Sequence, residues 1–297
     1  MVGIDQTVFL DGPPCVVIDK VKMTYRVASS DERTTFARKG LKGRISRLFR
    51  QANLVTVSAL KEISLVVERG ESVGIIGRNG SGKSTLMKLI SGQAAPSEGA
   101  VYASSTPVLL GVNAVLVPEL SGDQNVVLGC LAMGMSMEQI DEQFDSIVEV
   151  SGLDSAIYLP MKSYSAGMAS RLRFAIAAAV NPEILLVDEA LNTGDAQFGN
   201  RSKARMDELR SQAGCVFIVS HSLDTIRDMC SRVLWLDKGE LIMDGDPEET
   251  TRLYQEFSSH LSKGNNISAA KIKDDARANL VATQIMERAS GRRTEGR

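Results

Sequence analysis

A glycine-rich segment in the first third of the chain has the residue types and spacing of a phosphate-binding loop. Residues 77–84 read G-R-N-G-S-G-K-S, which satisfies the pattern G-x-x-x-x-G-K-[ST]. Glycines let such a loop turn successive backbone N–H groups inward, and the following helix N-terminus adds a partial positive charge. The pattern assigns the β- and γ-phosphates to Lys83 and a Mg²⁺ ligand to Ser84. The residues predicted to bind phosphate are Gly77, Asn79, Gly80, Ser81, Gly82, Lys83, Ser84 and Thr85.

The flanking residues support this interpretation. The segment follows an apolar run at 72–77 and precedes a helical pattern at 83–91. A glycine-rich turn between a strand and a helix needs no ligand, and the pattern arises by chance in a chain of this size with a probability on the order of one per cent. The strand before it and the helix after it favour the phosphate-binding interpretation.

Two carboxylates and a histidine follow two further apolar runs. The run at 184–187 ends in Asp188 and Glu189, and the run at 215–219 leads to His221. Strands that end beside the loop bring such groups near a bound phosphate. We therefore assign Asp188 to Mg²⁺, Glu189 to the attacking water, and His221 to the γ-phosphate as catalytic residues with Lys83. Without the loop, the acidic pair would indicate solvated charges at a helix start, and the histidine a satisfied polar residue.

A segment with serine and glycine opens a helical pattern between these motifs. Residues 163–168 read S-Y-S-A-G-M and precede an alanine-rich run at 169–180. The order and approximate spacing of the loop, this segment, the acidic pair and the histidine resemble the ABC transporter ATPases over roughly residues 16–250. In that family the segment matching residues 165–168 is the signature loop, usually closer to L-S-G-G-Q.

Departures from the usual family pattern indicate a resemblance to one subfamily. The Y-S-x-G-M form of residues 164–168 and the sequence L-N-T-G-D at 191–195 look like the subfamily that exports lipid-linked polysaccharides and teichoic acids, the Wzt and TagH type. Residues 118–122 and 243–247 and the basic stretch before Val55 resemble the same subfamily.

The resemblance implies a fold and an oligomer. The implied fold is an α/β P-loop NTPase core with a mostly parallel sheet, an antiparallel β subdomain and a helical subdomain. In the family's arrangement the signature loop completes the site of a second copy. Ser165 and Gly167 would then contact the ATP held by the partner in a head-to-tail homodimer, and hydrolysis would release the clamp.

Three further residues are assigned by the resemblance. Tyr25 matches the aromatic residue that stacks on adenine, although a strand-end tyrosine packed on the core fits the sequence nearly as well. Asp195 is included among the residues that bind ATP. The family usually has a Gln between the P-loop and the signature, where it contacts Mg²⁺ and senses the membrane subunit, whereas residues 111–114 read G-V-N-A. Asn113 offers the same amide on a shorter side chain and is the candidate Mg²⁺ ligand there.

The elements that must position these residues follow from the hydrophobic pattern. Helical patterns separate three apolar runs, at 72–77, 184–187 and 215–219. They predict a mostly parallel sheet with helices on both faces. Alternation at 16–25 predicts a further strand, and another strand pair begins near Val55.

The same pattern predicts the domain organisation. Residues 121–180 are mainly helical in pattern and would form a subdomain beside the sheet. We expect one ABC ATPase domain over residues 1–260 and a polar extension over 261–297, first a helix and then a tail. The helix would support a dimer or fray, and the final residues, 291–297, are typical of a tail. The apolar residues of that helix are Ile272, Leu280, Val281 and Ile285.

A basic stretch at 26–50 interrupts the first strands. Its apolar residues fall at near-helical spacing among arginines and lysines, which describes a basic amphipathic helix inserted into the domain. A solvated surface helix and a helix that docks on a membrane or a partner fit this composition equally well.

Composition limits the function classes. The chain has 297 residues, 43% of them hydrophobic, enough for a sizeable core. Its 34 basic and 36 acidic residues leave no overall field that would recruit nucleic acid. Four scattered cysteines without a C-x-x-C pair fit a reducing cytoplasm. Residues 1–10 lack the basic start of a secretory signal, and the nearly uncharged stretch at 126–135 is shorter than the roughly 18 to 20 apolar residues that cross a bilayer.

From motifs and resemblance together we expect the ATP-hydrolysing subunit of an exporter. It would use ATP and Mg²⁺, form a homodimer, and lie at the cytoplasmic face of the bacterial plasma membrane on a separate integral membrane permease. The cargo, a lipid-linked glycan such as O-antigen, galactan or teichoic acid, rests on resemblance alone. The alternatives are an ABC ATPase for another lipid or a drug, and a non-transport ABC ATPase. Glu189 argues against a regulator that does not hydrolyse ATP.

Overall fold

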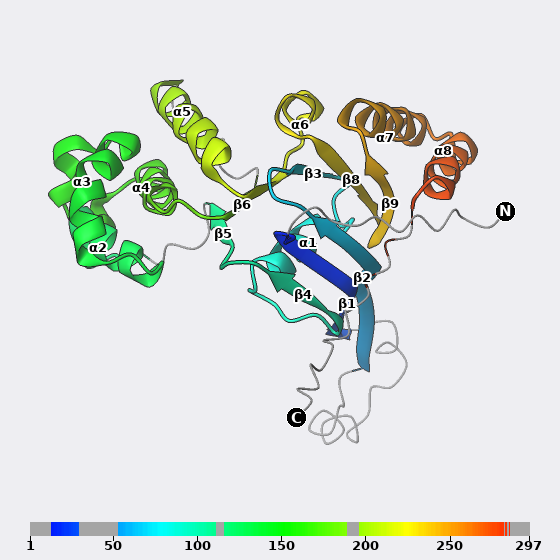
Figure 1. The fold of residues 1–297 in the computed structure, drawn as a ribbon, viewed down its shortest axis with the longest axis horizontal. Helices are drawn as coiled ribbons and strands as arrows, with labels where there is room; N and C mark the ends of the chain where they lie inside the picture. Colours follow the sequence, from blue (N-terminus) through cyan, green and yellow to red (C-terminus); the bar gives the residue numbers. More distant parts are fainter. Residues whose placement is uncertain are drawn as a thin grey trace, which may run out of the picture.

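The computed structural model describes residues 13–29, 53–110, 116–188, 196–281, 283 and 285, which form two β-sheets and the helices around them (Figure 1). The strands are β1 (Val16–Ser29), β2 (Asn53–Val67), β3 (Ser72–Ile76), β4 (Glu98–Ala103), β5 (Val108–Leu110), β6 (Ile184–Asp188), β7 (Cys215–Val219), β8 (Arg232–Asp237) and β9 (Glu240–Gly245). The α-helices are α1 (Lys83–Ile90), α2 (Gly122–Ala132), α3 (Met137–Ser151), α4 (Ala166–Ala179), α5 (Ala196–Gln212), α6 (Leu223–Met229), α7 (Pro247–Ser262) and α8 (Asn266–Ala278). Two short 3-10 helices, η3 (Asp154–Tyr158) and η4 (Met161–Ser163), precede α4.

The larger sheet has six strands in the order β5-β6-β7-β3-β8-β9. The first five strands are parallel, and β9 pairs antiparallel with β8. Both faces are buried, because Val73 and Ile75 of β3 belong to one core cluster while Ile76 belongs to another. On the second face a Cβ at Gly74 would lie 2.9 Å from Ile226 Cγ2, so α6 packs closely on the strand. The mostly parallel sheet covered on both faces confirms the fold class predicted from the sequence.

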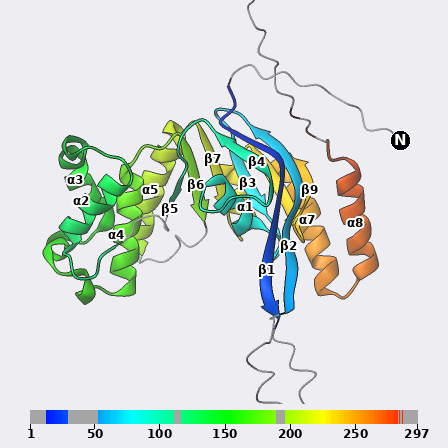
Figure 2. The ribbon, with the colours of Figure 1, turned by 90° about the horizontal axis from the view of Figure 1, so that it is seen from below.

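One face of the larger sheet is covered by α1 and by the smaller sheet. The smaller sheet has three antiparallel strands in the order β2-β1-β4, and it lies over α1 in Figure 2. Apolar residues of both sheets and of α1 share one core cluster, in which Leu65, Leu86 and Phe217 are each at most 2% exposed. Helix α1 is therefore held between two sheets.

The opposite face is covered by α5, α6, α7 and α8. The core cluster on this side includes Trp235 of β8, whose side chain is completely buried. Its ring centroid lies 5.7 Å from that of Tyr254 in a T-shaped arrangement and 5.1 Å from that of Phe257. These aromatic contacts hold α7 against the sheet.

Helices α2, α3 and α4 form a group of their own beside β5 (Figure 1). Their facing sides enclose a separate core cluster that includes Val126, Ile140 and Leu172. Helix α3 begins with a capping box, in which Ser136 Oγ accepts from the Gln139 N–H at 3.2 Å and Gln139 Oε1 accepts from the Ser136 N–H at 2.9 Å. The mainly helical pattern at 121–180 thus corresponds to helices with their own buried sides.

Two peripheral segments differ from the sequence expectation. Strand β1 continues past Tyr25 to Ser29, which pairs with Asn53, so the predicted insertion at 26–50 begins inside a strand. The reason is that residues 26–29 find partners in the first residues of β2, and pairing outweighs the basic composition. The rest of that segment lies outside the described residues.

The end of the chain also differs. Helix α8 stops at Ala278, so Ile272 belongs to it whereas Leu280, Val281 and Ile285 lie beyond it. The proposed tail at 291–297 lies outside the described residues. Within the described ranges, the helices are all too short or too polar to cross a bilayer.

Candidate functional site

Parallel strand pairing brings the ends of β3, β7 and β6 to one edge of the larger sheet. Ile75 of β3 is in register with Val219 of β7, and Val219 is in register with Asp188 at the end of β6. The glycine-rich loop leaves β3 one residue after this row, and His221 follows β7 by two residues. Neighbouring strands lie about 4.8 Å apart, so the backbone positions of Asp188, His221 and the loop are close together.

The glycine-rich loop depends on backbone conformations that favour glycine. Gly77, Gly80 and Gly82 have φ angles of 151°, 77° and 109°. A Cβ on Gly77 would lie 2.2 Å from the Leu236 carbonyl oxygen, and one on Gly82 would lie 2.9 Å from the Ala59 carbonyl oxygen. The loop is therefore packed against the main chain of β8 on one side and of β2 on the other.

Lys83 begins α1 and folds back over the loop. Its side chain is only 8% exposed, and its Nζ donates to the carbonyl oxygens of Gly77 at 2.6 Å and Arg78 at 3.1 Å. The residue before it, Gly82, is the N-cap and has no side chain to cap the first turn. A buried ammonium group above an uncapped helix N-terminus is an environment that stabilises a phosphate group.

Ser81 provides a direct indication that the loop fits a ligand. Its Oγ is buried and makes no hydrogen bond within the described parts of the chain. A buried hydroxyl without a partner costs free energy, and such a group in a native loop needs an explanation. A bound phosphate would supply one. Ser84 is exposed and Thr85 half-buried in the first turn of α1, and Asn79 is exposed on the loop.

The signature segment lies on the other side of the fold. Ser165 is the N-cap of α4, where its Oγ accepts from the Met168 N–H at 3.2 Å. Ser165 and Gly167 are both exposed. Strands β5 and β6 separate α4 from α1 in Figures 1 and 2. The structure therefore does not bring Ser165 and Gly167 to Lys83 of the same chain.

A hydrogen bond from the neighbouring tyrosine anchors this segment. Tyr164 Oη donates to the Ala156 carbonyl oxygen at 2.7 Å, and burial, together with the charge of Asp123, raises the pKa of Tyr164. A Cβ on Gly122 would lie 2.3 Å from the Tyr164 Oη, so only glycine fits there. Two segments singled out in the sequence, 118–122 and 163–168, are thus packed together.

Asn125 holds the first of these two segments. It is completely buried, its Oδ1 accepts from the Val117 N–H at 2.7 Å, and its Nδ2 donates to the carbonyl oxygens of Val117 at 3.0 Å and Ser121 at 2.8 Å. Through these hydrogen bonds, the buried Asn125 side chain fixes the path of residues 117–121 before α2 begins.

Tyr25 lies on β1 in the smaller sheet, opposite Val57 of β2, and is 38% exposed. Two residues further along β2, the Ala59 carbonyl oxygen contacts the glycine-rich loop at Gly82. The strand pair that carries Tyr25 therefore lies beside the loop. An exposed aromatic face at this position can stack on a planar ring.

Several predicted site residues cannot be placed. Glu189, Asp195 and Asn113 lie outside the described residues. Asp188 is described as the last residue of β6, and His221 is exposed after β7.

The sequence patterns missed one contributor to the loop, the turn between β8 and β9. The Gly239 N–H donates to the Ser81 carbonyl oxygen at 2.9 Å, and the Leu236 carbonyl oxygen lies beside Gly77. The Lys238-Gly239 sequence indicates a turn, but nothing in it indicates contact with a loop so far away in the chain.

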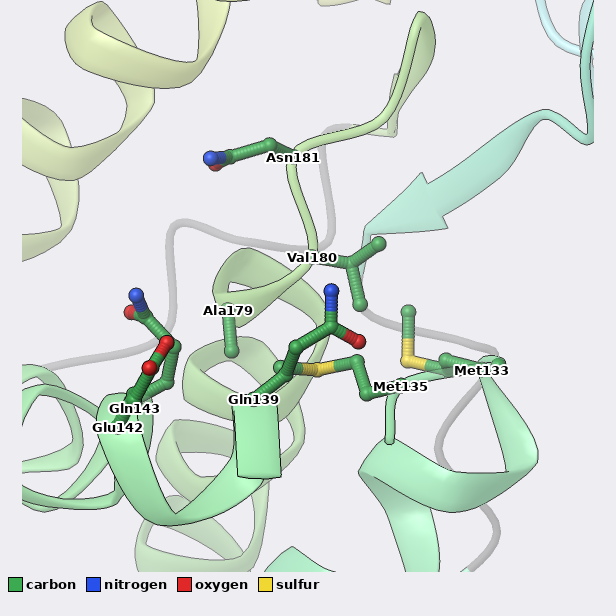
Figure 3. A pocket seen from close by; sticks show the side chains of 9 residues that line it. Met133, Met135, Gln139, Glu142, Gln143, Ala179, Val180 and Asn181 are labelled. Carbon is green, nitrogen blue, oxygen red and sulfur yellow. The ribbon is translucent and has the colours of Figure 1, made fainter. Parts of the chain in front are cut away.

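A separate cavity of about 320 Å³ lies among the helices beside β5 (Figure 3). It is bounded by the link between α2 and α3, the first turns of α3 and the end of α4, and Met133, Met135 and Gln139 point toward it. Its lining contains none of the predicted site residues.

Comparison with known proteins agrees with the motifs. The family model described as ABC transporter matches residues 60–192. The teichoic acids export ATP-binding protein TagH of Staphylococcus saprophyticus is 34% identical over 220 residues, which are 74% of this chain and 83% of that protein. The O-antigen export system ATP-binding protein RfbB of Myxococcus xanthus is 37% identical over 246 residues, 82% of this chain and 56% of that protein.

The chain spans about half the length of several other curated relatives, and 39% of the TagH of Bacillus anthracis, to which it is 40% identical over 216 residues. Among solved structures, the dimeric ATP-binding cassette MJ0796 in a post-hydrolysis state bound to ADP and Pi superposes with a TM-score of 0.59 at 23% identity, covering 78% of this chain and 98% of that one. That likeness shows the fold, and the sequence relatives show the family. The chain belongs to the ABC transporter ATP-binding proteins, in the group related to teichoic acid and O-antigen exporters.

Proposed function

We propose that this chain is the ATP-hydrolysing subunit of an exporter, acting as a homodimer on a separate membrane permease. The cargo would be a lipid-linked polysaccharide of the teichoic acid, galactan or O-antigen type. The relatives named above are ATP-binding proteins of teichoic acid and O-antigen export systems, which supports the cargo class. Such a subunit would lie at the cytoplasmic face of the plasma membrane.

One observation carries the proposal, the arrangement of the glycine-rich loop around Lys83. Its glycines adopt left-handed conformations, its lysine is buried over two loop carbonyl groups, and the Ser81 hydroxyl is buried without a partner. The strands that end in Asp188 and lead to His221 finish at the same edge. The glycine-rich loop, the positive charge of Lys83 and the ends of these strands thus lie together where a nucleoside triphosphate would bind.

The residues of this edge would share the work on the triphosphate. ATP would supply the transferable γ-phosphoryl group, and Mg²⁺ would neutralise its oxygens. Lys83 would bind the β- and γ-phosphates, while Ser84 and Asp188 would hold the metal ion, with Asn113 as a third candidate. Glu189 would polarise the attacking water, and His221 would stabilise charge on the γ-phosphate. The fit of a triphosphate rests on the orphaned Ser81 hydroxyl and the uncapped start of α1.

The position of α4 supports the homodimer. Ser165 and Gly167 are exposed at a helix N-terminus, which suits an anion, yet they lie across β5 and β6 from their own loop. A second copy in a two-fold, head-to-tail arrangement would place each signature segment over the other copy's triphosphate. Asp195 and Tyr25 would complete the ATP contacts, Tyr25 by stacking on adenine.

Changing Glu189 to Gln tests the hydrolytic step. We expect Glu189→Gln to bind ATP and dimerise stably while turnover falls by a factor of about 10², because the amide cannot accept a proton from the attacking water. The measurement is phosphate release by the purified full-length chain, with dimerisation followed by light scattering in the presence of ATP.

Glu142→Gln is the matched control. Glu142 is exposed on α3, so this substitution removes the same charge at a position remote from the loop. It should hydrolyse ATP at the wild-type rate. If Glu189→Gln also does so, Glu189 has no catalytic role.

Mixing two inactive variants tests the shared site. A Lys83→Ala chain lacks a working loop, and a Ser165→Arg chain lacks a working signature. Each homodimer should be inactive, whereas a heterodimer has one site built from the two intact halves. After random mixing in equal amounts, about a quarter of the wild-type activity should return, because about half of the dimers are then mixed and each has one working site. Normal ATP hydrolysis by either variant alone would contradict the shared site.

A further inference from the structure

Helix α8 lies in the C-terminal extension, for which the sequence left a dimer support and a frayed helix open. One side of it is packed, because Ala269 and Ala276 are 1% and 3% exposed within the core cluster that contains Trp235. The helix lies beside α7 and β9 in Figures 1 and 2. It is therefore part of the folded domain.

Two basic residues of α8 reach the turn that joins β8 to β9. Lys273 Nζ lies 2.7 Å from Asp237 Oδ2 and 3.9 Å from Glu240 Oε2, and Arg277 lies 3.4 Å from Glu240 Oε2. The Asp237 side chain is 6% exposed and that of Lys273 19%, so this pair is largely shielded from water. Shielding makes such a charge-assisted hydrogen bond stronger than a surface ion pair.

The turn itself has the geometry of a tight hairpin. Asp237 and Glu240 pair across it, and Lys238 and Gly239 between them have φ angles of 49° and 78°. Lys61 of β2 also contacts the turn. Its Nζ donates to Glu240 Oε1 at 2.6 Å, and its backbone N–H donates to the Gly239 carbonyl oxygen at 2.7 Å. The hydrogen bond from Lys61, then the charges of Arg277 and Lys273, lower the pKa of Glu240.

This turn contacts the phosphate-binding loop directly. The Gly239 N–H donates to the Ser81 carbonyl oxygen at 2.9 Å. Because a trans peptide unit is planar, the Ser81 carbonyl and the Gly82 N–H point in opposite directions. Holding the carbonyl toward the turn therefore holds the Gly82 N–H away from it. Gly82 is the N-cap of α1, so this bond sets the direction of an N–H at the anion-binding end of the helix.

We propose that Lys273 is a positioning residue for the phosphate-binding loop. Through Asp237 it holds the β8–β9 turn in place. The turn then holds the Ser81 peptide group through the Gly239 N–H. The proposal rests on the function proposed above, since it assigns α8 to the support of the same nucleotide site. Without the Lys273 ammonium, the buried Asp237 carboxylate loses its charge partner and regains free energy by turning to water, which moves the turn.

Hydrogen exchange of the Gly239 amide tests the link in the absence of nucleotide. In Lys273→Met we expect this amide to exchange about tenfold faster than in the wild type, because the turn opens more often. Lys271→Met is the matched control, as Lys271 is exposed on the same helix. It should leave the exchange rate unchanged. Lys273→Arg keeps the charge and should restore most of the protection.

Nucleotide affinity is the second measurement on the same full-length proteins. The dissociation constant for Mg-ADP should rise about fivefold in Lys273→Met and stay at the wild-type value in Lys271→Met. The double variant Asp237→Asn with Lys273→Met removes both charges, so it folds without a buried unpaired carboxylate. It should show faster Gly239 exchange and weaker Mg-ADP binding than the wild type, because the contact that holds the turn is missing. Both changes should be smaller than in Lys273→Met, because no unpaired carboxylate is drawn to water.

Three outcomes separate the hypotheses. If Gly239 exchange and Mg-ADP affinity match between Lys273→Met and Lys271→Met, the positioning role is wrong. Faster exchange spread equally over all core amides would likewise overturn it, because the effect would be general destabilisation. A wild-type chain that binds no Mg-ADP, with Gly239 exchange still sensitive to Lys273, would contradict the proposed function and keep the link between α8 and the turn.

Discussion

Replacing Lys83 by methionine is expected to lower kcat/KM for ATP hydrolysis by about 10³. Lys83 is 8% exposed, and its Nζ lies 2.6 Å from the Gly77 carbonyl oxygen, at the start of α1. A buried positive charge aimed at transferring phosphate oxygens acts where water cannot screen it, so its loss is not replaced by solvent. Methionine keeps a flexible stem of similar length and a similar helix propensity.

The expected effect of Lys83→Met on folding is small, which separates activity from stability. Two loop carbonyl groups, of Gly77 and Arg78, lose a hydrogen bond, which costs about 1 to 2 kcal/mol, while removing a desolvated charge offsets part of that cost. Steady-state kinetics over a range of ATP concentrations and the midpoint of thermal unfolding are the two measurements. Lys88→Met is the control, because Lys88 is exposed on the same helix. A kcat/KM for Lys83→Met within tenfold of the wild-type value would show that Lys83 does not act on the triphosphate.

Replacing Gly77 by alanine is expected to lower the free energy of unfolding by about 4 kcal/mol and to abolish nucleotide binding. The φ angle of 151° is strained for any residue with a Cβ, and the new Cβ would lie 2.2 Å from the Leu236 carbonyl oxygen and 2.6 Å from Ser81 Oγ. The first of these atoms belongs to the main chain of a buried strand, so it cannot move aside. The loop itself must shift, and its N–H groups shift with it.

Gly92→Ala isolates the backbone strain from the steric clash. Gly92 follows α1, has a φ angle of 71°, and a Cβ there would meet no atom within 4 Å. The cost should be about 1 to 2 kcal/mol, with nucleotide affinity unchanged. Denaturant unfolding and titration with Mg-ADP measure both effects. A Gly77→Ala variant that is no less stable than Gly92→Ala would mean that the contact with Leu236 is wrong.

The strands and the helix around the site motifs were predictable because each follows from a local pattern. The loop at 77–84 lies between a strand and a helix in the sequence, and the structure places it between β3 and α1. The apolar runs before Asp188 and His221 become β6 and β7, whose parallel register with β3 brings their ends together. Hydrophobic periodicity and loop composition determine such elements from neighbouring residues alone.

Some boundaries were not predictable, because pairing partners decide them. Strand β1 extends through residues 26–29, which read as part of a basic insertion until their partners in β2 are known. The cross-strand contacts outweigh the local composition there.

The sequence by itself determined the motifs on which the proposed chemistry depends: a glycine-rich loop, an acidic pair at the end of an apolar run, and a serine before a helical run, each defined by residues close together in the chain. Only the tertiary structure decided what supports that chemistry. The contact of Gly239 with Ser81 and the ion pair of Lys273 with Asp237 join segments that are far apart in sequence. Such contacts leave no periodic signal, because they depend on how packed strands and helices place a turn in space.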